Sequence, residues 1–576
     1  MQSVWGIVRK AWDGISTQEN IEEFWEVTDV VSEVSEKVYS VFMDWIWEQG
    51  EIMIWNRRMQ RAKDWKSWEF SAKKLDELRG MEDWKKRDAS TLYDYKLLKR
   101  RLRLIRNMRE NENIEALVHH LRSGLLRGLG GCLNPELYKR CLVGTKQIIQ
   151  EYQEEVCKSL KCIVDSSKFP LKAKLTFFSE SRYAFGKTAL MLSGGASLGM
   201  YHLGVVKALY KKDLLPRVIC GTSAGSIVAA MVGTTSPQDL PNWFASGKIK
   251  YGPFAGKEKG SVYRKLRRFL TSGHFMDIKV LETFVRANVG ELTFQEAFEK
   301  TGTILNITVS ESSEHQDYRL MNYLTAPHVL IWSAAIASCA IPLVFEPVEL
   351  KCKNHKGEIV SYHPPGLKFI DGSVKADLPM QRLSELFNVN AFVVSQVNPW
   401  VIPLLTPDDG GSHGHDSLLF RLIKNIKKLI LMEFRHRVQQ FNLLGYSKCL
   451  SGFLGIFTQE YRGNVTIWPV PSVKDYLNIL SNPSEEDIQR FIEKGMLRTF
   501  PKVNMVSSIL AIEKTFEKCY LQIREKLQVD SVTLRVALKN QSEQIKFKEH
   551  HIHPGFSILP ELKELIDQEC PLSDND

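Results

Sequence analysis

Hydrophobic residues recur every three or four positions through the first third of the chain, which is the spacing of one face of a helix. The clearest run is Val27, Val30, Val31, Val34, Val38, Val41, Phe42 and Trp45. Acidic residues on its opposite face argue against docking of this segment on an anionic bilayer. Nine of the 13 tryptophans fall at or before Trp84. We expect a helical domain over residues 1–180, whose indoles either fill gaps in a helical core or, at Trp45, Trp47 and Trp55, lie at a lipid boundary.

A different pattern follows. Short apolar runs alternate with helical stretches between residues 181 and 400, and the runs cover 189–192, 217–220, 304–309, 367–370 and 391–397. Strands that alternate with helices predict an α/β domain with a mostly parallel sheet. Chemistry in such sheets gathers at the carboxyl ends of the strands. Residues 181–400 are therefore the expected catalytic domain.

Residues 401–576 are expected to form a mostly helical extension with a polar tail. A loop, PDDGGSHGHD, leads into FRLIKNIKKLILMEFRHRVQQF, which mixes six lysine and arginine residues with leucine and isoleucine at helical spacing. This segment is either a surface helix with a solvated basic face or a helix that lies on a lipid surface.

Composition narrows the class of protein only moderately. A chain of 576 residues predicts two to four domains, and 44% hydrophobic with 25% charged residues is typical of a globular protein. The net charge of +10 is spread along the chain, and no nucleic-acid or zinc-binding motif is present. We find no signal peptide and no apolar run long enough to cross a membrane, so the ten cysteines are expected to be reduced thiols in a cytoplasmic protein.

The sequence GTSAG at 221–225 places Ser223 between two glycines. The motif alone is weak, but an apolar strand precedes it and an apolar helical stretch follows it. Strand, tight turn and helix are the setting of a nucleophile elbow, in which Gly221 and Gly225 allow the turn and Ser223 is exposed to substrate. The dipole of the following helix favours the negative charge that develops there.

A serine nucleophile also needs a base and donors for the oxyanion. SGGASLG at 193–199 follows the first strand, and the backbone N–H groups of Gly194, Gly195, Ala196 and Gly199 can form an anion-binding turn. The alternative is a dinucleotide-binding fingerprint, but the acidic residue expected after the second strand is missing, because Cys220 leads directly into the serine turn.

Asp371 supplies the candidate base. It ends the apolar run 367–370 and precedes Gly372, so it lies at the edge of the same predicted sheet. Asp377 is the nearest rival, although the chain has left the strand there. A Ser–His–Asp triad is the mechanistic alternative, with His413, His415 or His436 after Asp371. His202 is expected to pack or to form hydrogen bonds on its helix.

Taken in order, SGGASLG, GTSAG and DGS resemble the patatin-like phospholipase family. Longer stretches, including YLTAPHVLIWSAAIASCAIPLVF and FIDGSVKADLPM, are similar to the fungal and plant storage triacylglycerol lipases of that family. WEFSAKKLDELRGMEDWKKRD resembles the helical domain that precedes their catalytic domain. The likeness covers about residues 65–520.

The resemblance implies a patatin-like sheet of mostly parallel strands flanked by helices, with a Ser223–Asp371 dyad and an oxyanion hole at Gly194, Gly195 and Ala196. It implies a serine lipase that acts on triacylglycerol at a lipid-droplet or endoplasmic reticulum surface, without a cofactor or metal. Ala196, Leu198 and Ser373 depart from the general pattern, which has glycine, a basic residue, and glycine or alanine there. Two other functions stay open: a phospholipase A or lysophospholipase, and a non-catalytic scaffold on a lipid surface.

Overall fold

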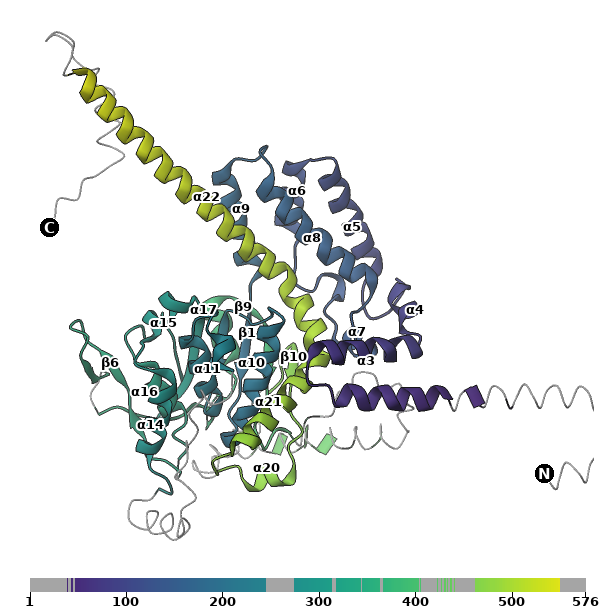
Figure 1. Cartoon of the computed structure of the whole chain (residues 1–576), viewed down its shortest axis with the longest axis vertical. Helices are drawn as coiled ribbons and strands as arrows, with labels where there is room; N and C mark the ends of the chain where they lie inside the picture. Colours follow the sequence, from purple (N-terminus) through teal and green to yellow (C-terminus); the bar gives the residue numbers. More distant parts are fainter. Residues whose placement is uncertain are drawn as a thin grey trace, which may run out of the picture.

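The computed structural model of the protein describes residues 47–244, 274–312, 318–402 and 461–549, except positions 343, 363–365 and 375. It also describes single positions in 39–44, at 405 and in 422–440, and side chains as far as residue 528. The predicted apolar run at 27–45 and most of the basic segment at 420–441 lie outside the described residues. Figure 1 shows an N-terminal group of helices, a sheet-containing domain beside it, and one long helix that crosses both.

The N-terminal region is helical, as the sequence predicts. A helix over residues 47–60 is followed by α3 (Trp65–Leu78), α4 (Met81–Lys86), α5 (Tyr95–Glu110), α6 (Ile114–Gly124), α7 (Pro135–Arg140), α8 (Gln147–Asp165) and α9 (Leu171–Phe185). The side chains of Asp64, Asp94 and Asn113 each accept a hydrogen bond from the third backbone N–H beyond them and cap a helix start. The buried faces of α5, α6 and α8 form one core with α22.

The described tryptophans include buried and exposed side chains, and the buried ones confirm the expected core role, whereas the lipid boundary stays a prediction. Trp68 is fully buried and packs against Phe500 with ring centroids 6.0 Å apart. Trp47 is exposed, and Trp55 is half-buried beside the exposed Phe70. Trp45 lies outside the described residues.

The central sheet has eight strands, and its main path runs β10-β9-β1-β2-β3-β8-β5 with β4 paired to β3. Their bounds are β1 (Lys187–Leu192), β2 (Val218–Gly221), β3 (Ile304–Glu311), β4 (Tyr318–Met321), β5 (Val348–Glu349), β8 (Lys368–Asp371), β9 (Val389–Ser395) and β10 (Val465–Ile467). A small separate ribbon pairs β6 (Lys351–Lys353) with β7 (Ile359–Ser361). All five apolar runs that the sequence marks as strands are strands, and the predicted fold class is confirmed.

Strand direction differs across the sheet. Strands β10, β9, β1, β2 and β3 are parallel, whereas β8 is antiparallel to β3. The rule that active sites form at carboxyl ends of parallel strands therefore does not by itself place Asp371. Asp371 reaches the end of β2 because β8 pairs only with the last residues of β3, with Asp371 opposite Val309.

Helices cover both faces of the sheet. Their bounds are α10 (Tyr201–Lys211), α11 (Ala224–Thr234), α12 (Leu240–Trp243), α14 (Ile278–Val289), α15 (Phe294–Thr301), α16 (Ile331–Ser338), α17 (Met380–Phe387), α20 (Val473–Leu477), α21 (Glu485–Thr499) and α22 (Val503–Glu549). Helix α10 packs on α21, and α11 packs on α16. Leu383 and Phe387 of α17 cover the opposite face with Met191 and Val218 of the sheet.

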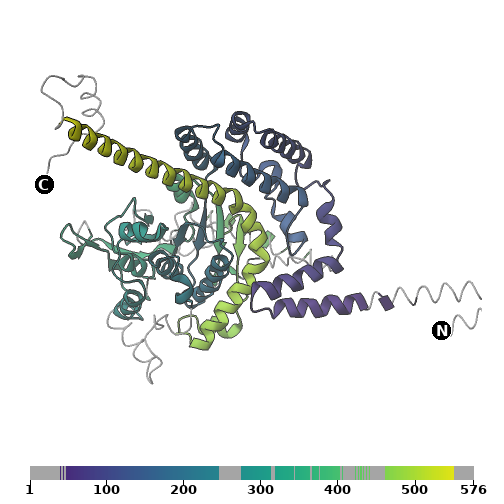
Figure 2. The same cartoon turned by 45° about the horizontal axis from the view of Figure 1, so that its top comes forward.

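The long helix α22 joins the N-terminal helices to the sheet, as Figures 1 and 2 both show. Its Glu513 carboxylate accepts a hydrogen bond from the Thr188 backbone N–H at 3.0 Å and pairs with Arg127 at 2.8 Å. Arg127 also donates to the Ile509 carbonyl at 2.9 Å. One polar cluster therefore connects β1, the segment after α6, and α22.

Candidate active site

Ser223 lies at the turn between β2 and α11, where the sequence predicts a nucleophile elbow. Its backbone angles, φ 52° and ψ −126°, are rare for a residue with a side chain, and such outliers concentrate at functional sites. A Cβ at Gly221 would lie 2.3 Å from the Gly225 carbonyl oxygen, and a Cβ at Gly225 would lie 2.2 Å from that of Leu192. Only glycine fits at both positions, so the flanking residues hold Ser223 in this conformation.

A network of buried hydroxyl groups fixes the turn. The Ser223 backbone N–H donates to Ser338 Oγ at 2.9 Å, and Ser338 Oγ donates to the Thr308 carbonyl at 2.7 Å. Thr222 Oγ1 donates to the Asp377 carbonyl at 2.8 Å. Because its own N–H is engaged, the Ser223 amide is not available to an oxyanion.

Asp371 is fully buried at the end of β8, beside Ser223. The Ser373 backbone N–H donates to its Oδ1 at 2.7 Å. Burial raises the pKa of Asp371 to about 6, although the Ser223 hydroxyl and the Ser373 N–H both lower it. Its Oδ2 is buried and forms no hydrogen bond of standard length and angle with a described group. The Ser223 hydroxyl is close enough to lower the pKa of Asp371, and hydrogen bonds of this kind often become well aligned only when substrate binds.

The glycine-rich turn after β1 lies against the same serine. A Cβ added at Gly194 would lie 3.2 Å from the Ser223 Cβ, and one at Gly199 would lie 2.7 Å from the Ala224 Cβ. The Gly194 N–H donates to Asp377 Oδ1 at 2.8 Å. Within the described residues, the N–H groups of Gly195 and Ala196 have no hydrogen-bond acceptor. The N–H groups of Gly195 and Ala196 are therefore free, whereas the Gly194 N–H, also predicted as an oxyanion donor, is instead engaged by Asp377.

Two further residues at the site escaped the sequence reasoning. Asp377, considered there only as a rival base, is buried and interacts with Asn398 and Gln396 besides Gly194. Burial, with a smaller contribution from the charge of Asp371, raises its pKa to about 7. The amide of Ala224 also has no acceptor among the described groups, and the residue after the nucleophile supplies an oxyanion donor in nucleophile elbows. Ala224 directly follows Ser223 in the sequence, and that position is the signal by which it could have been identified.

The residues that depart from the general family pattern are all accommodated. Ala196 adopts φ 49°, a left-handed conformation that its methyl group tolerates at some cost. Leu198, which stands where a basic residue is common, is fully buried in the hydrophobic core. Ser373 uses its N–H on Asp371.

No described histidine lines the pocket beside Ser223. His202 is fully buried, with Nδ1 2.7 Å from Ser395 Oγ and Nε2 2.9 Å from the Ser193 carbonyl oxygen, which confirms the expected packing role. Burial lowers its pKa to about 4. His436 lies beside Gln440 on an exposed helical turn. His413 and His415 are outside the described residues.

An apolar pocket opens at Ser223. Its lining comes from the glycine-rich turn, α14, the segment after α16 and the loop after α20, and includes Met200, Ile227, Leu281, Phe284, Phe345 and Leu480. The lining has the apolar character that suits a hydrocarbon chain, and the free volume is about 50 Å³. In the described part of the chain, no group of three or more histidine, cysteine or acidic side chains has an arrangement that would bind a metal ion. None of its helices combines the length and apolar composition that crossing a membrane requires.

The fold and this site define an α/β protein with a serine nucleophile elbow. Residues 190–383 match the model of the patatin-like phospholipase family, and residues 45–183 match a domain of unknown function, DUF3336. Triacylglycerol lipase 5 of Saccharomyces cerevisiae is 33% identical over 91% of this chain and 73% of its own, and ptl3 of Schizosaccharomyces pombe is 33% identical over 81% and 97%. The chain belongs to the patatin-like family that contains these triacylglycerol lipases.

Other relatives are longer. Triacylglycerol lipase SDP1L of Arabidopsis thaliana is 38% identical over 81% of this chain, and the match spans 58% of that protein. Among solved structures, VipD from Legionella pneumophila aligns at 13% identity with a TM-score of 0.24, over 53% of this chain and 67% of that one.

Proposed function

We propose that this protein is a serine lipase that hydrolyses the acyl esters of triacylglycerol at a lipid surface. The observation that supports it best is the buried Asp371 carboxylate beside the strained Ser223, at the inner end of an apolar pocket. The triacylglycerol lipases among its relatives support the same substrate class.

The reaction follows from the geometry. Asp371 accepts the hydroxyl proton as Ser223 Oγ attacks the ester carbonyl carbon. The negative charge on the carbonyl oxygen is held by the N–H groups of Gly195 and Ala196. The tetrahedral intermediate collapses, the diacylglycerol alcohol leaves with the proton, and the acyl chain stays on Ser223. Water then attacks the acyl-enzyme with Asp371 as base and releases the fatty acid.

A pair of substitutions tests the dyad. Ser223→Ala removes the nucleophile and Asp371→Asn removes the base, so each should lower hydrolysis of emulsified triolein about a thousandfold or more. Thermal unfolding should stay cooperative in both. A fluorophosphonate probe should label the wild type at Ser223 and leave Ser223→Ala unlabelled.

Ser197→Ala is the matched control, because Ser197 lines the same pocket outside the elbow, and it should retain labelling and turnover. Turnover by either dyad variant close to the wild-type rate would refute the proposal. A wild-type protein that is neither labelled nor active would favour the scaffold. Hydrolysis of phosphatidylcholine in preference to triolein would favour the phospholipase.

We further propose peripheral association with a lipid droplet or the endoplasmic reticulum surface. The apolar pocket at Ser223 and the lipid substrates of the named relatives support this placement. Fractionation of cells should then recover the protein with lipid droplets or microsomes, and release it with alkaline carbonate.

A further inference from the structure

Four apolar side chains around α20 are open to solvent. The exposed fractions are 76% at Val473 and 81% at Leu477, with 55% at Val470 and 39% at Leu480. Val473 and Leu477 are the first and last residues of α20 and lie four positions apart, so they share one side of the helix, whereas Val470 lies just before the helix and Leu480 just after it. Single exposed apolar residues are ordinary, whereas a contiguous group marks an interaction site. We call these four residues the α20 rim.

The α20 rim continues into the apolar pocket. Leu480 belongs to both, and Pro483 of the same loop also lines the pocket beside Ser223. The Ser197 N–H, next to the candidate oxyanion donors, donates to the Ile479 carbonyl at 3.1 Å. The loop that carries the rim is therefore attached to the oxyanion turn itself and borders the mouth of the pocket.

The α20 rim is also held firmly. Asp475, in the middle of α20, is buried and accepts hydrogen bonds from the Ser472 N–H and from Arg490, each at 2.8 Å. Ser472 and Asp475 form a capping box at the start of the helix. Figure 1 shows α20 at the lower edge of the sheet domain. The exposure of Val473 and Leu477 is thus fixed by the buried side of the same turn.

We propose that the α20 rim inserts into the surface of a lipid particle and brings the mouth of the Ser223 pocket against it. This inference rests on the proposed lipase function. A triacylglycerol molecule could then pass from the particle to Ser223 along Leu480 without entering water. The only charged side chains of α20 are Lys474, which is exposed, and Asp475, which is buried. Insertion of α20 into a lipid surface would therefore bring few charged groups into contact with the lipid.

The test compares the full chain with a Val473→Asp/Leu477→Asp variant on triolein droplets coated with neutral phosphatidylcholine. Two carboxylates on the inserted face should weaken droplet binding about tenfold or more and lower triolein hydrolysis in proportion. Hydrolysis of dissolved p-nitrophenyl butyrate should stay unchanged, because Ser223 and Asp371 are not altered. Val473→Phe, which enlarges the apolar face, should strengthen droplet binding.

Leu126→Asp is the matched control, since Leu126 is similarly exposed and does not line the pocket, and it should bind as the wild type does. If the double variant binds droplets as well as the wild type does, the proposal that the α20 rim inserts into the lipid surface is refuted, while the proposed Ser223–Asp371 dyad is unaffected. Equal losses in Leu126→Asp and the double variant, or no gain in Val473→Phe, would also overturn it. Loss of p-nitrophenyl butyrate hydrolysis in Ser223→Ala alone tests the proposed function separately.

A second candidate binding surface lies on the N-terminal helices. An open groove of about 600 Å³ lies between the helix over residues 47–60 and α3. Arg57, Arg58, Arg61 and Lys63 border it and are exposed, and none of them forms an ion pair with a described residue. Its one acidic residue, Asp64, caps α3 through the Ser67 N–H at 2.8 Å.

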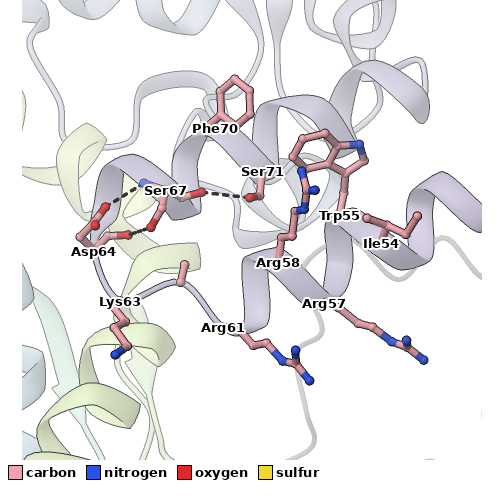
Figure 3. A pocket seen from close by; sticks show the side chains of 11 residues that line it. Ile54, Trp55, Arg57, Arg58, Arg61, Lys63, Asp64, Ser67, Phe70 and Ser71 are labelled. Atoms are coloured by element: carbon pink, nitrogen blue, oxygen red, sulfur yellow. Dashed lines mark hydrogen bonds between the residues drawn. The ribbon is translucent and has the colours of Figure 1, made fainter.

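Aromatic and aliphatic side chains stand among these cations. The Arg58 guanidinium lies 4.7 Å from the centre of the Trp55 ring, and Trp55 packs edge to face on Phe70. Ile54 and Phe70 are both more than half exposed. Figure 3 shows Arg57 and Arg61 extending away from α3, while Arg58 lies with Trp55 between the two helices.

We infer that this groove binds the headgroup of an anionic phospholipid, with Ile54, Trp55 and Phe70 at the level of the headgroups. Unpaired arginine and lysine side chains complement a phosphate, and the exposed aromatic ring suits the polar–apolar boundary. This contact concerns a different chemical group from the one that the α20 rim meets, so the two are tested separately.

The test measures flotation of the full chain with vesicles of phosphatidylcholine alone and with added phosphatidic acid. Phosphatidic acid should increase the binding of the wild type to vesicles, and in Arg57→Glu/Arg58→Glu/Arg61→Glu this increase should be at least about tenfold smaller. The increase should also become smaller at higher salt concentration. Binding to neutral vesicles should not change.

Lys96→Glu/Arg100→Glu/Arg103→Glu on α5 is the charge-matched control, because these three cations are exposed and form no ion pair with a described residue. It should keep the phosphatidic acid response. Equal losses of the phosphatidic acid response in the two triple variants would show that only net charge matters, and would refute the groove as a binding site. No loss in the groove variant would overturn it as well, and soluble phosphate that competes without vesicles would assign the groove to a free anion.

Discussion

Burial decides the charge of Asp371. A carboxylate must be ionised to accept the Ser223 proton, and the pKa of Asp371 is raised to about 6 by its buried position. The folded protein therefore holds this proton more tightly than the unfolded chain, so raising the pH from about 4 to about 6 lowers the stability while it forms the carboxylate that the proposed mechanism requires.

We expect the rate constant kcat/KM on a dissolved ester to rise with pH and to level off above about pH 6. An ordinary aspartate would level off near pH 4, because its usual pKa is 3.8. Asp377→Asn should leave this midpoint near 6, since Asp377, with its pKa raised to about 7, is mostly protonated below it. A midpoint near pH 4 would contradict the burial argument.

A midpoint near 6 does not by itself separate Asp371 from a histidine, whose usual value is about 6.5. The temperature dependence does, because a carboxyl group ionises with almost no heat and an imidazole with much. The midpoint should stay fixed between cold and warm assays. A midpoint that falls clearly on warming would favour the Ser–His–Asp alternative, with the base among the histidines beyond residue 400.

At the scale of elements, one side chain positions a whole turn. Asp377 lies after β8 and accepts a hydrogen bond from the Gly194 N–H, while its own carbonyl accepts one from Thr222. It thereby ties the oxyanion turn after β1 to the elbow after β2. In the proposed mechanism, Asp377 positions the N–H groups of Gly195 and Ala196 through this contact.

Asp377→Ala should therefore lower kcat on a dissolved ester by about tenfold to a hundredfold, somewhat less than loss of a whole oxyanion donor. Asp377→Asn should stay within a few-fold of the wild type, because its amide oxygen can still accept from Gly194. The two variants are compared by steady-state kinetics and by the rate of fluorophosphonate labelling. Equal loss in both would show that the charge matters and not the acceptor.

The strands and the positions of Ser223 and Asp371 at their ends could be predicted because their signals are local. The apolar runs before Gly221 and Asp371 predict strands directly, and GTSAG and DGS stand at their ends. The antiparallel course of β8 and the pairing of Gly194 with Asp377 depend on contacts between residues 58 or more positions apart, which leave no local pattern. The charge of the buried carboxyls likewise follows from packing and cannot be read from residue types.

At the scale of the whole molecule, the sheet collects strands from distant parts of the sequence. Its edge strand β10 lies beyond residue 460, and β1 is bonded to Glu513 of α22. The helical N-terminal region and the helical C-terminal extension are predicted from periodicity. The ion pair of Arg127 with Glu513 that joins them is not predicted, because a single polar contact leaves no periodic pattern in the sequence.

The bonds from Arg127 and Glu513 to the first strand have a practical consequence for anyone who trims this protein. A fragment cut to residues 190–383 would lack Thr188, the parallel strands β9 and β10, and the helix α22, whose Glu513 is bonded to Thr188. The strand edge exposed by the cut would favour self-association. Inactivity of such a fragment would therefore reflect the missing strands and helix, and it would not be evidence against Ser223 as the nucleophile.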